Sequence, residues 1–240
     1  IHYLFERFIE RYNRFMPNSQ NSSDAIIIGG GHNGLVCAYY LATKGLKIQI
    51  YEKRSIVGGA AVTEEFHPRF RNSVASYTVS LLNPEIIKDM KLKEYGLKVV
   101  KRPISNFLPI DNKTYLKLGG GLERTQNEFK KFSEKDAERL PEYYERIEAV
   151  ADVLRGLSIK TPPNPKQGIR AALNAALQLW PIVNKGNQVH RDVYDLFTKS
   201  ARSFLDSWFE NEHIKAAFGF DSIVGNFASP DTPGSAYVLL

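Results

Sequence analysis

The stretch DAIIIGGGHNG, residues 24–34, decides the fold. Its first part, Ala25–Ile28, is a short apolar run rich in β-branched residues, which is typical of a strand buried on both faces of a parallel sheet. Its second part fits the spacing GxGxxG at Gly29, Gly31 and Gly34. A strand that leads directly into such a turn predicts the first half of a βαβ dinucleotide-binding unit.

The residues that follow complete this unit. Apolar side chains recur at helical spacing from Leu35 until Gly45, where we expect the helix to end. Residues 47–51 then read as a second strand, which delivers Glu52 at its carboxyl end. Glu52 follows Gly34 by 18 residues, close to the spacing of about 20 expected for an acid that binds a ribose.

Each residue of the motif has its own predicted task. Gly29 permits the tight turn, Gly31 lets the backbone approach a diphosphate, and Gly34 lets the helix pack close to the sheet. The N-terminus of the helix offers free N–H groups and a partial positive charge to the phosphates. Glu52 is expected to accept hydrogen bonds from ribose hydroxyls, and its charge disfavours the 2′-phosphate of NADP.

A second glycine pair extends the pattern. Residues 52–60, EKRSIVGGA, resemble the E-x-R-x-x-x-G-G extension of FAD-binding amine oxidases and phytoene-desaturase-like proteins. In that position Gly58 and Gly59 let the backbone pass close to the diphosphate or ribityl chain of a flavin, and Arg54 lies near the phosphates or the adenine. The predicted cofactor-binding residues are Gly29, Gly30, Gly31, His32, Asn33, Gly34, Glu52, Lys53, Arg54, Gly58, Gly59 and Ala60. No catalytic side chain is predicted, although Ser73, Ser76 and Tyr77 are candidates to face a flavin.

The resemblance extends along the chain. Matching stretches are residues 29–36 (GGGHNGLV), 58–65 (GGAAVTEE), 75–77 (ASY), 80–82 (SLL) and 229–235 (SPDTPGS). Over residues 24–240 the chain resembles the animal pyridine nucleotide-disulfide oxidoreductase domain-containing proteins, which form part of the phytoene-desaturase-like family of FAD-dependent oxidoreductases.

This resemblance implies a mitochondrial FAD-dependent oxidoreductase that transfers a hydride or electrons through its flavin and acts on a small, apolar substrate. It also implies a further FAD-contacting segment beyond residue 240, so we expect the chain to be an N-terminal fragment. The disulfide chemistry in the family name is not carried over, because Cys37 is the single cysteine. Two alternatives stay open: an NAD-dependent oxidoreductase, and a non-catalytic regulatory or interaction protein on a flavoprotein scaffold.

The predicted fold class is α/β, a Rossmann-like FAD/NAD(P)-binding domain followed by a partial, mainly helical substrate or cap region. The predicted division is a leader helix and linker at residues 1–23, the FAD-binding βαβ domain at 24–102, and a hairpin with helices at 103–240. The leader is amphipathic and rich in arginine, as in a mitochondrial transit peptide, whereas Glu6 and Glu10 favour a helix that docks on the body.

Local patterns predict the remaining elements. The sequence Asn83-Pro84-Glu85 predicts a helix start and Gly96 its end. A strand is predicted at residues 97–101, a hairpin at 104–110 and 114–118, capping boxes at Thr125 and Ser133, and helices through 147–154, 169–180 and 189–209. Seven aromatic residues are expected mostly in the core: Trp180, Phe197, Phe204, Trp208, Phe209, Phe218 and Phe220.

The composition excludes several classes of function. The net charge is +6, but no basic tract interleaved with aromatic residues predicts nucleic-acid binding. The longest apolar runs fall far short of the ~20 residues of a membrane-spanning helix, which leaves a peripheral membrane association open. His67, His190 and His213 lack metal-ligand spacing, so no metal site is predicted. Cys37 reads as a packed thiol on the first helix.

Overall fold

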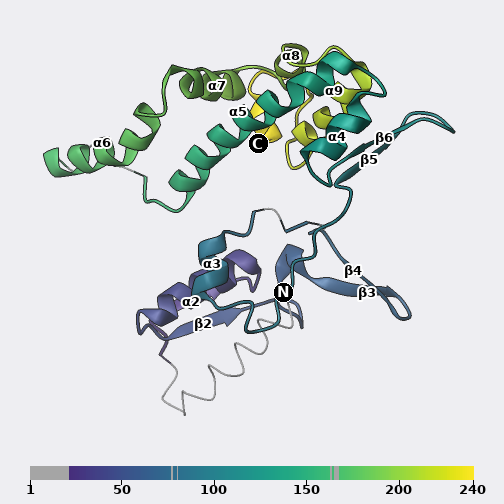
Figure 1. The fold of residues 1–240 in the computed structure, drawn as a ribbon. Coiled ribbons are helices and arrows are strands. Elements are labelled where there is room, and N and C mark those ends of the chain that lie inside the picture. Colours follow the sequence, from purple (N-terminus) through teal and green to yellow (C-terminus); the bar gives the residue numbers. More distant parts are fainter. Residues whose placement is uncertain (1–21, 77, 80, 163, 165–167) are drawn as a thin grey trace. The chain divides into compact units, whose positions relative to one another are not determined.

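In the computed structural model of the chain, the described residues are 22–76, 78–79, 81–162, 164 and 168–240. They form two compact units, one within residues 1–101 and one within 102–240, and each unit is described by itself (Figure 1). The predicted leader helix lies outside the described residues.

The first unit opens with the predicted βαβ arrangement. β1 (Ala25–Ile28) and β2 (Ile48–Tyr51) pair in parallel along all four residues of each strand. α2 (His32–Thr43) connects them, and Gly45, with a φ of 85°, lies directly beyond the end of this helix. The expected α/β class is confirmed.

The prediction that β1 is buried on both faces is wrong. Ile26 is 56% exposed and Ile28 is 82% exposed, whereas Ile27 is half-buried. Leu35 and Ala38 of α2 are buried, so this helix covers one face of the two-stranded sheet. No described residue buries the opposite face. A run of β-branched residues predicts a strand, but it does not tell how many faces of that strand are covered.

A small apolar cluster fixes α2 to the chain that follows α3 (Pro84–Asp89). Its buried members are Leu35, Met90 and Leu92. The predicted start of α3 is confirmed, because the side chain of Asn83 accepts the N–H of Glu85 at 2.9 Å. The helix ends earlier than expected, since the residues between Asp89 and Gly96 continue as turns rather than as a helix.

Residues 97–101 are irregular, so the strand predicted there is wrong. Val99 and Val100 are 55% and 72% exposed. A strand requires a neighbour that takes up its backbone N–H and C=O groups, and no described segment pairs with these residues. The apolar sequence alone was therefore not sufficient to form a strand.

The first unit also contains a hairpin that the sequence did not predict. β3 (Thr63–His67) and β4 (Phe70–Ser73) pair in antiparallel orientation, with an irregularity between Glu65 and His67. Most of their side chains are exposed. Since neither strand has a continuous apolar face, the alternation that reveals a half-buried strand is missing from the sequence.

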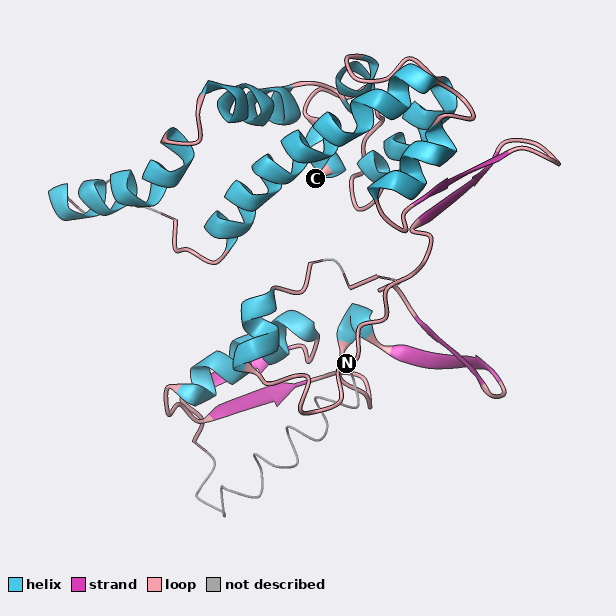
Figure 2. Ribbon diagram, viewed as in Figure 1, coloured by secondary structure: helices cyan, strands magenta, loops and turns pink. Residues whose placement is uncertain are grey.

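The second unit is mainly helical and contains one hairpin (Figure 2). β5 (Asn106–Pro109) and β6 (Tyr115–Leu118) form the predicted antiparallel pair. Its helices are α4 (Leu122–Phe129), α5 (Glu134–Ser158), α6 (Ile169–Val183), α7 (Asn187–Thr198), α8 (Ala201–Asp206) and α9 (Glu212–Gly219). It also contains the short 3-10 helices η3 (Asp221–Ile223) and η4 (Ser235–Leu239). The first unit contains the 3-10 helix η1 (Gly59–Ala61).

The predicted cap of α5 is confirmed. The hydroxyl of Ser133 accepts the N–H of Asp136 at 3.1 Å. The fully buried carboxylate of Asp136 does not return this bond but accepts the N–H groups of Glu210 and Asn211, each at 2.9 Å. Asp136 therefore joins the start of α5 to the segment that precedes α9.

Two other predictions about helix boundaries are wrong. Thr125 is not a cap but lies inside α4, where its hydroxyl donates to the carbonyl oxygen of Gly121 at 3.0 Å. The helix predicted over residues 189–209 is two helices, α7 and α8. The chain is extended at Lys199, and the hydroxyl of Ser200 then caps α8. A local cap outweighs the apolar periodicity that continues across the break.

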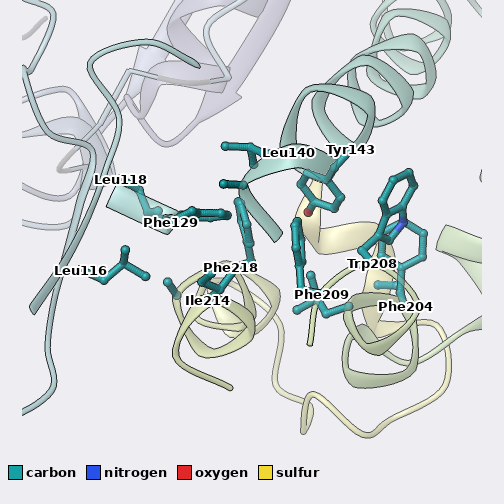
Figure 3. Close-up of a cluster of buried hydrophobic side chains, with 14 of the residues drawn as sticks. Leu116, Leu118, Phe129, Leu140, Tyr143, Phe204, Trp208, Phe209, Ile214 and Phe218 are labelled. Atoms are coloured by element: carbon teal, nitrogen blue, oxygen red, sulfur yellow. The ribbon is translucent and has the colours of Figure 1, made fainter. Parts of the chain in front are cut away.

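An aromatic cluster forms the core of the second unit (Figure 3). The ring of Tyr143 lies 5.0 Å from the rings of Phe209 and Phe218, which stack on each other at 5.3 Å. Phe204 and Trp208 are also buried here, as predicted. Three aromatic residues expected in the core are exposed instead, namely Trp180, Phe197 and Phe220.

Candidate dinucleotide-binding site

The glycine-rich turn joins the end of β1 to the start of α2. Gly29 donates its N–H to the carbonyl oxygen of Tyr51 at 2.7 Å, which ties the turn to β2. Gly31 is the N-cap of α2, and its carbonyl oxygen accepts the N–H of Leu35 at 2.9 Å. A Cβ at Gly34 would lie 2.3 Å from the carbonyl oxygen of Gly29. Only glycine therefore lets the helix begin this close to the strand, which is the packing task predicted for Gly34.

The second glycine pair lies directly against this turn. Gly58 donates its N–H to the carbonyl oxygen of Gly30 at 2.7 Å and forms a bridge with Gly31. Gly59 has a φ of 56°, and a Cβ there would lie 2.9 Å from the Cα of Gly31. The two glycine motifs are thus two backbone segments in contact, and a side chain at Gly59 would push them apart.

Glu52 lies at the end of β2, where the sequence predicted it. Its carboxylate accepts the N–H of Arg54 at 2.9 Å and the N–H of Gly30 at 2.7 Å. These backbone donors, Arg54 first and then Gly30, hold the pKa of Glu52 below its ordinary value, so the side chain is ionised at neutral pH. A carboxylate offers about four lone-pair sites, which leaves acceptor capacity for a ribose hydroxyl.

A cavity of about 570 Å³ opens at the start of α2. His32 and Asn33, the first two residues of the helix, line it together with Ala60. In the described structure no side chain caps the N-terminus of α2, and its first turn has no acidic residue. The first N–H groups of α2 and the positive end of its dipole are therefore open to an anion. The other walls are mostly apolar and include Val36, Ala61, Val79, Leu82 and Ile86.

The two basic residues after Glu52 have different surroundings. The guanidinium of Arg54 pairs with the carboxylate of Glu64 on β3, and both side chains are nearly half exposed. Lys53 is exposed. Arg54 would have to leave Glu64 to reach a phosphate or an adenine.

Sequence reasoning missed two parts of this region. It did not identify Glu64 as the partner of Arg54, because the hairpin that carries Glu64 was not predicted. It also did not identify Ala75, Thr78, Val79, Leu81 and Leu82 as a wall of the cavity. Of the three candidates to face a flavin, Ser76 lines the cavity, and Tyr77 lies outside the described residues. Ser73 ends β4 and is not a lining residue, but its hydroxyl accepts the N–H of Ser76 at 2.9 Å. The motif ASY at residues 75–77 was the signal that pointed to this wall.

Among the residues that the structure describes, no helix is long and apolar enough to cross a membrane. Among the same residues, no three His, Cys, Asp or Glu side chains come together in a way that could hold a metal ion. Cys37 is exposed, so its interpretation as a packed thiol is wrong. It lies on the outer face of α2, whereas Leu35 and Ala38 point inward.

Known proteins share this sequence pattern. Residues 27–90 match the family described as an NAD(P)-binding Rossmann-like domain. Pyridine nucleotide-disulfide oxidoreductase domain-containing protein 2 of Rattus norvegicus is 37% identical over 231 residues, which cover 90% of this chain. The chain is a relative of that protein. It spans 40% of the length of this relative, and the resemblance predicted from the motifs is confirmed.

Two bacterial dehydrogenases are more distant relatives. One of the subunits of the limonene dehydrogenase of Castellaniella defragrans is 34% identical over 129 residues, which are 54% of this chain and 24% of that protein. The 4,4′-diapolycopen-4-al dehydrogenase of Metabacillus indicus is 26% identical over 204 residues, which are 82% of this chain and 38% of that protein. The match therefore includes the helical unit as well as the dinucleotide-binding domain.

Proposed function

We propose that this chain is the cofactor-binding part of an FAD-dependent oxidoreductase. The observation that carries the proposal is the contact between the two glycine pairs. The N–H of Gly58 is bonded to the carbonyl oxygen of Gly30 at 2.7 Å, beside the cavity that His32, Asn33 and Ala60 line. A nicotinamide site requires the first glycine motif alone, whereas the second pair lets a further backbone segment pass close to the diphosphate or the ribityl chain of a flavin.

The residues present fit such a cofactor. The first N–H groups of α2 lack a side-chain cap and would hold the diphosphate. Gly31 presents bare backbone at the same place, with no Cβ between the turn and an approaching phosphate. Glu52 would hold the ribose hydroxyls through its remaining lone pairs. Gly59 and Ala60 would lie along the part of the cofactor that enters the cavity.

Bound FAD would supply the redox chemistry, accepting a hydride or electrons from the substrate. The residues of this chain bind and orient the cofactor, and the apolar walls of the cavity exclude water from it. No side chain in the described structure is assigned a catalytic role.

NAD is the second candidate cofactor, because the matching family is described as NAD(P)-binding. The site disfavours the phosphorylated form, NADP. Glu52 is ionised and would repel a 2′-phosphate, and the nearest guanidinium, that of Arg54, is already paired with Glu64. The choice therefore lies between FAD and NAD.

A small apolar substrate and a mitochondrial location complete the proposal. The apolar substrate is supported by two relatives whose names refer to limonene and to 4,4′-diapolycopen-4-al. The location rests on the resemblance to the animal pyridine nucleotide-disulfide oxidoreductase domain-containing proteins. Residues 1–15 are arginine-rich and amphipathic, as in a transit peptide, but Glu6 and Glu10 depart from that pattern. Fractionation of cells that express the tagged full-length protein tests the location, and recovery in the cytosol with no mitochondrial fraction would contradict it.

The absorption spectrum of the purified full-length protein tests the cofactor. We expect flavin bands, and FAD when the cofactor released by denaturation is identified by chromatography and mass. Stoichiometric NAD without flavin would favour the second candidate. FAD that stays oxidised under a wide panel of donors would instead indicate a flavoprotein scaffold without catalysis.

A further inference from the structure

Three large apolar side chains of helix α6 are exposed. Leu173, Leu177 and Trp180 are 60%, 71% and 59% exposed. Their spacing of four and three residues places them on one face of the helix. Ala171 and Ala175, on the opposite face, are half-buried. A helix face that packs on its own core buries its large apolar residues, and this face leaves them exposed.

The surroundings of α6 separate this face from the core. α6 lies at one edge of the helical unit (Figure 1). None of its described side chains belongs to the aromatic cluster of that unit. Single exposed leucines are ordinary on protein surfaces, but a continuous stripe of two leucines and a tryptophan marks an interaction site.

The segment around α6 also carries a concentrated positive charge. Between Asp152 and Asp192 the sequence has six Lys or Arg residues and no Asp or Glu, and this excess equals the net charge of +6 of the whole chain. Arg170 in the first turn of α6 and Lys185 just beyond its end are exposed, and neither forms an ion pair with a described residue. An apolar stripe flanked by cations that are not neutralised is complementary to an anionic surface with an apolar interior.

We propose that α6 lies in the interface of an anionic membrane, parallel to its surface. Leu173, Leu177 and Trp180 enter the boundary between headgroups and acyl chains, where tryptophan is favoured because its ring is apolar and its N–H is polar. Arg170 and Lys185 lie at the level of the headgroups. At 15 residues the helix is too short to span a bilayer, which needs about 20. A second copy of α6 fits this face less well, because two segments of the same positive charge would meet. The proposal does not depend on the flavin.

Sedimentation of the full-length protein with vesicles tests this proposal. We expect binding to vesicles that contain phosphatidylglycerol, weakening with added salt, and little binding to phosphatidylcholine alone. The double variant R170Q/K185Q should bind about 25-fold more weakly, since each cation near an anionic surface contributes about fivefold. Leu177→Glu should abolish binding. Tyr194→Glu is the matched control, because Tyr194 is a 68% exposed apolar residue on α7, and it should bind like the wild type.

The fluorescence of Trp180, isolated by comparison with Trp180→Phe, separates the alternatives. Insertion into the interface should shift its emission to the blue when anionic vesicles are added, and should protect it from a water-soluble quencher. Protection that is complete before vesicles are added would mean that another part of the full-length protein covers α6, and would overturn the proposal. A dimer that Leu177→Glu dissociates, together with no vesicle binding, would overturn it as well.

Discussion

Replacement of Gly31 by alanine isolates the contact between the turn and a diphosphate. Gly31 has a φ of −72°, which alanine adopts without strain. A Cβ there would meet its nearest heavy atom, the Cα of Gly59, at 3.7 Å, an ordinary van der Waals distance. The folded chain therefore has room for the methyl group. A phosphate held by the first N–H groups of α2 would have no such room, because the methyl group would occupy the bare backbone surface that the phosphate approaches.

The two costs of Gly31→Ala differ in size. Alanine is a poorer N-cap than glycine, so folding should lose at most about 1 kcal/mol. A hydrogen bond from a backbone N–H to a charged group contributes about 1.5–3 kcal/mol. Displacing the diphosphate from one such donor should therefore weaken FAD binding by about 10- to 150-fold.

Titration of the full-length apoprotein with FAD, followed by flavin fluorescence, measures this effect, and thermal unfolding in the absence of FAD checks the fold. Gly34→Ala is the contrasting variant. Its Cβ would lie 2.3 Å from the carbonyl oxygen of Gly29, so we expect it to disrupt the βαβ unit itself. A folded Gly31→Ala protein that binds FAD with wild-type affinity would refute the assignment of this turn to the diphosphate.

Three further variants test other contacts. Glu52→Gln keeps one oxygen acceptor but turns an NH₂ group toward a backbone N–H, so FAD should bind more weakly in a titration. Because the pKa of Glu52 is lowered in the fold, its charge should stabilise the folded chain above the pKa of the unfolded chain, and this stability should be lost as the pH falls through the lowered value, which unfolding of wild type and variant across a pH series measures. Asp136→Ala leaves two backbone N–H groups, those of Glu210 and Asn211, without their acceptor, and should destabilise the helical unit by about 2–5 kcal/mol in urea unfolding, with Asp136→Asn losing less. Gly156→Ala in the last turn of α5, where nothing lies within 4 Å of a new Cβ, should stabilise the same unit by at most about 0.5–1 kcal/mol, and a loss of stability would contradict a helical conformation at this position.

The parts of the fold that the sequence predicted well have local causes. The βαβ unit follows from a strand, a turn that requires glycine and a helix, all within residues 25–51. The cap at Ser133 and the start at Asn83 depend on side chains that bond to the backbone two or three residues away. Such interactions are complete within a few residues, so a sequence pattern is enough to reveal them.

The predictions that failed depend on distant partners. Val99 and Val100 are of a residue type that is typical of strands, but no described segment pairs with them. Ile26 and Ile28 are of a type that is typical of buried strands, but no described residue covers their face of the sheet. In the candidate site, the pairing of Arg54 with Glu64 required a hairpin of mostly exposed residues. The residue types of a segment indicate which conformations and degrees of burial it can adopt. Whether the segment is buried or paired depends on contacts with segments that are distant in the sequence.

The hydrogen bonds of the turn separate the structural tasks of the motif from its binding tasks. Gly29 is bonded to Tyr51, Gly30 to Glu52, and Gly58 to Gly30, all within the chain itself. A turn held in this way before the cofactor arrives does not have to be ordered by binding, which lowers the entropic cost of binding. Glu52 is part of this internal network, so a change at Glu52 alters both the turn and the ribose contact. The N–H groups that remain without a partner in this network are those at the start of α2, after Gly31. A methyl group at Gly31 would therefore disturb the diphosphate that these N–H groups bind, without breaking any hydrogen bond that holds the turn.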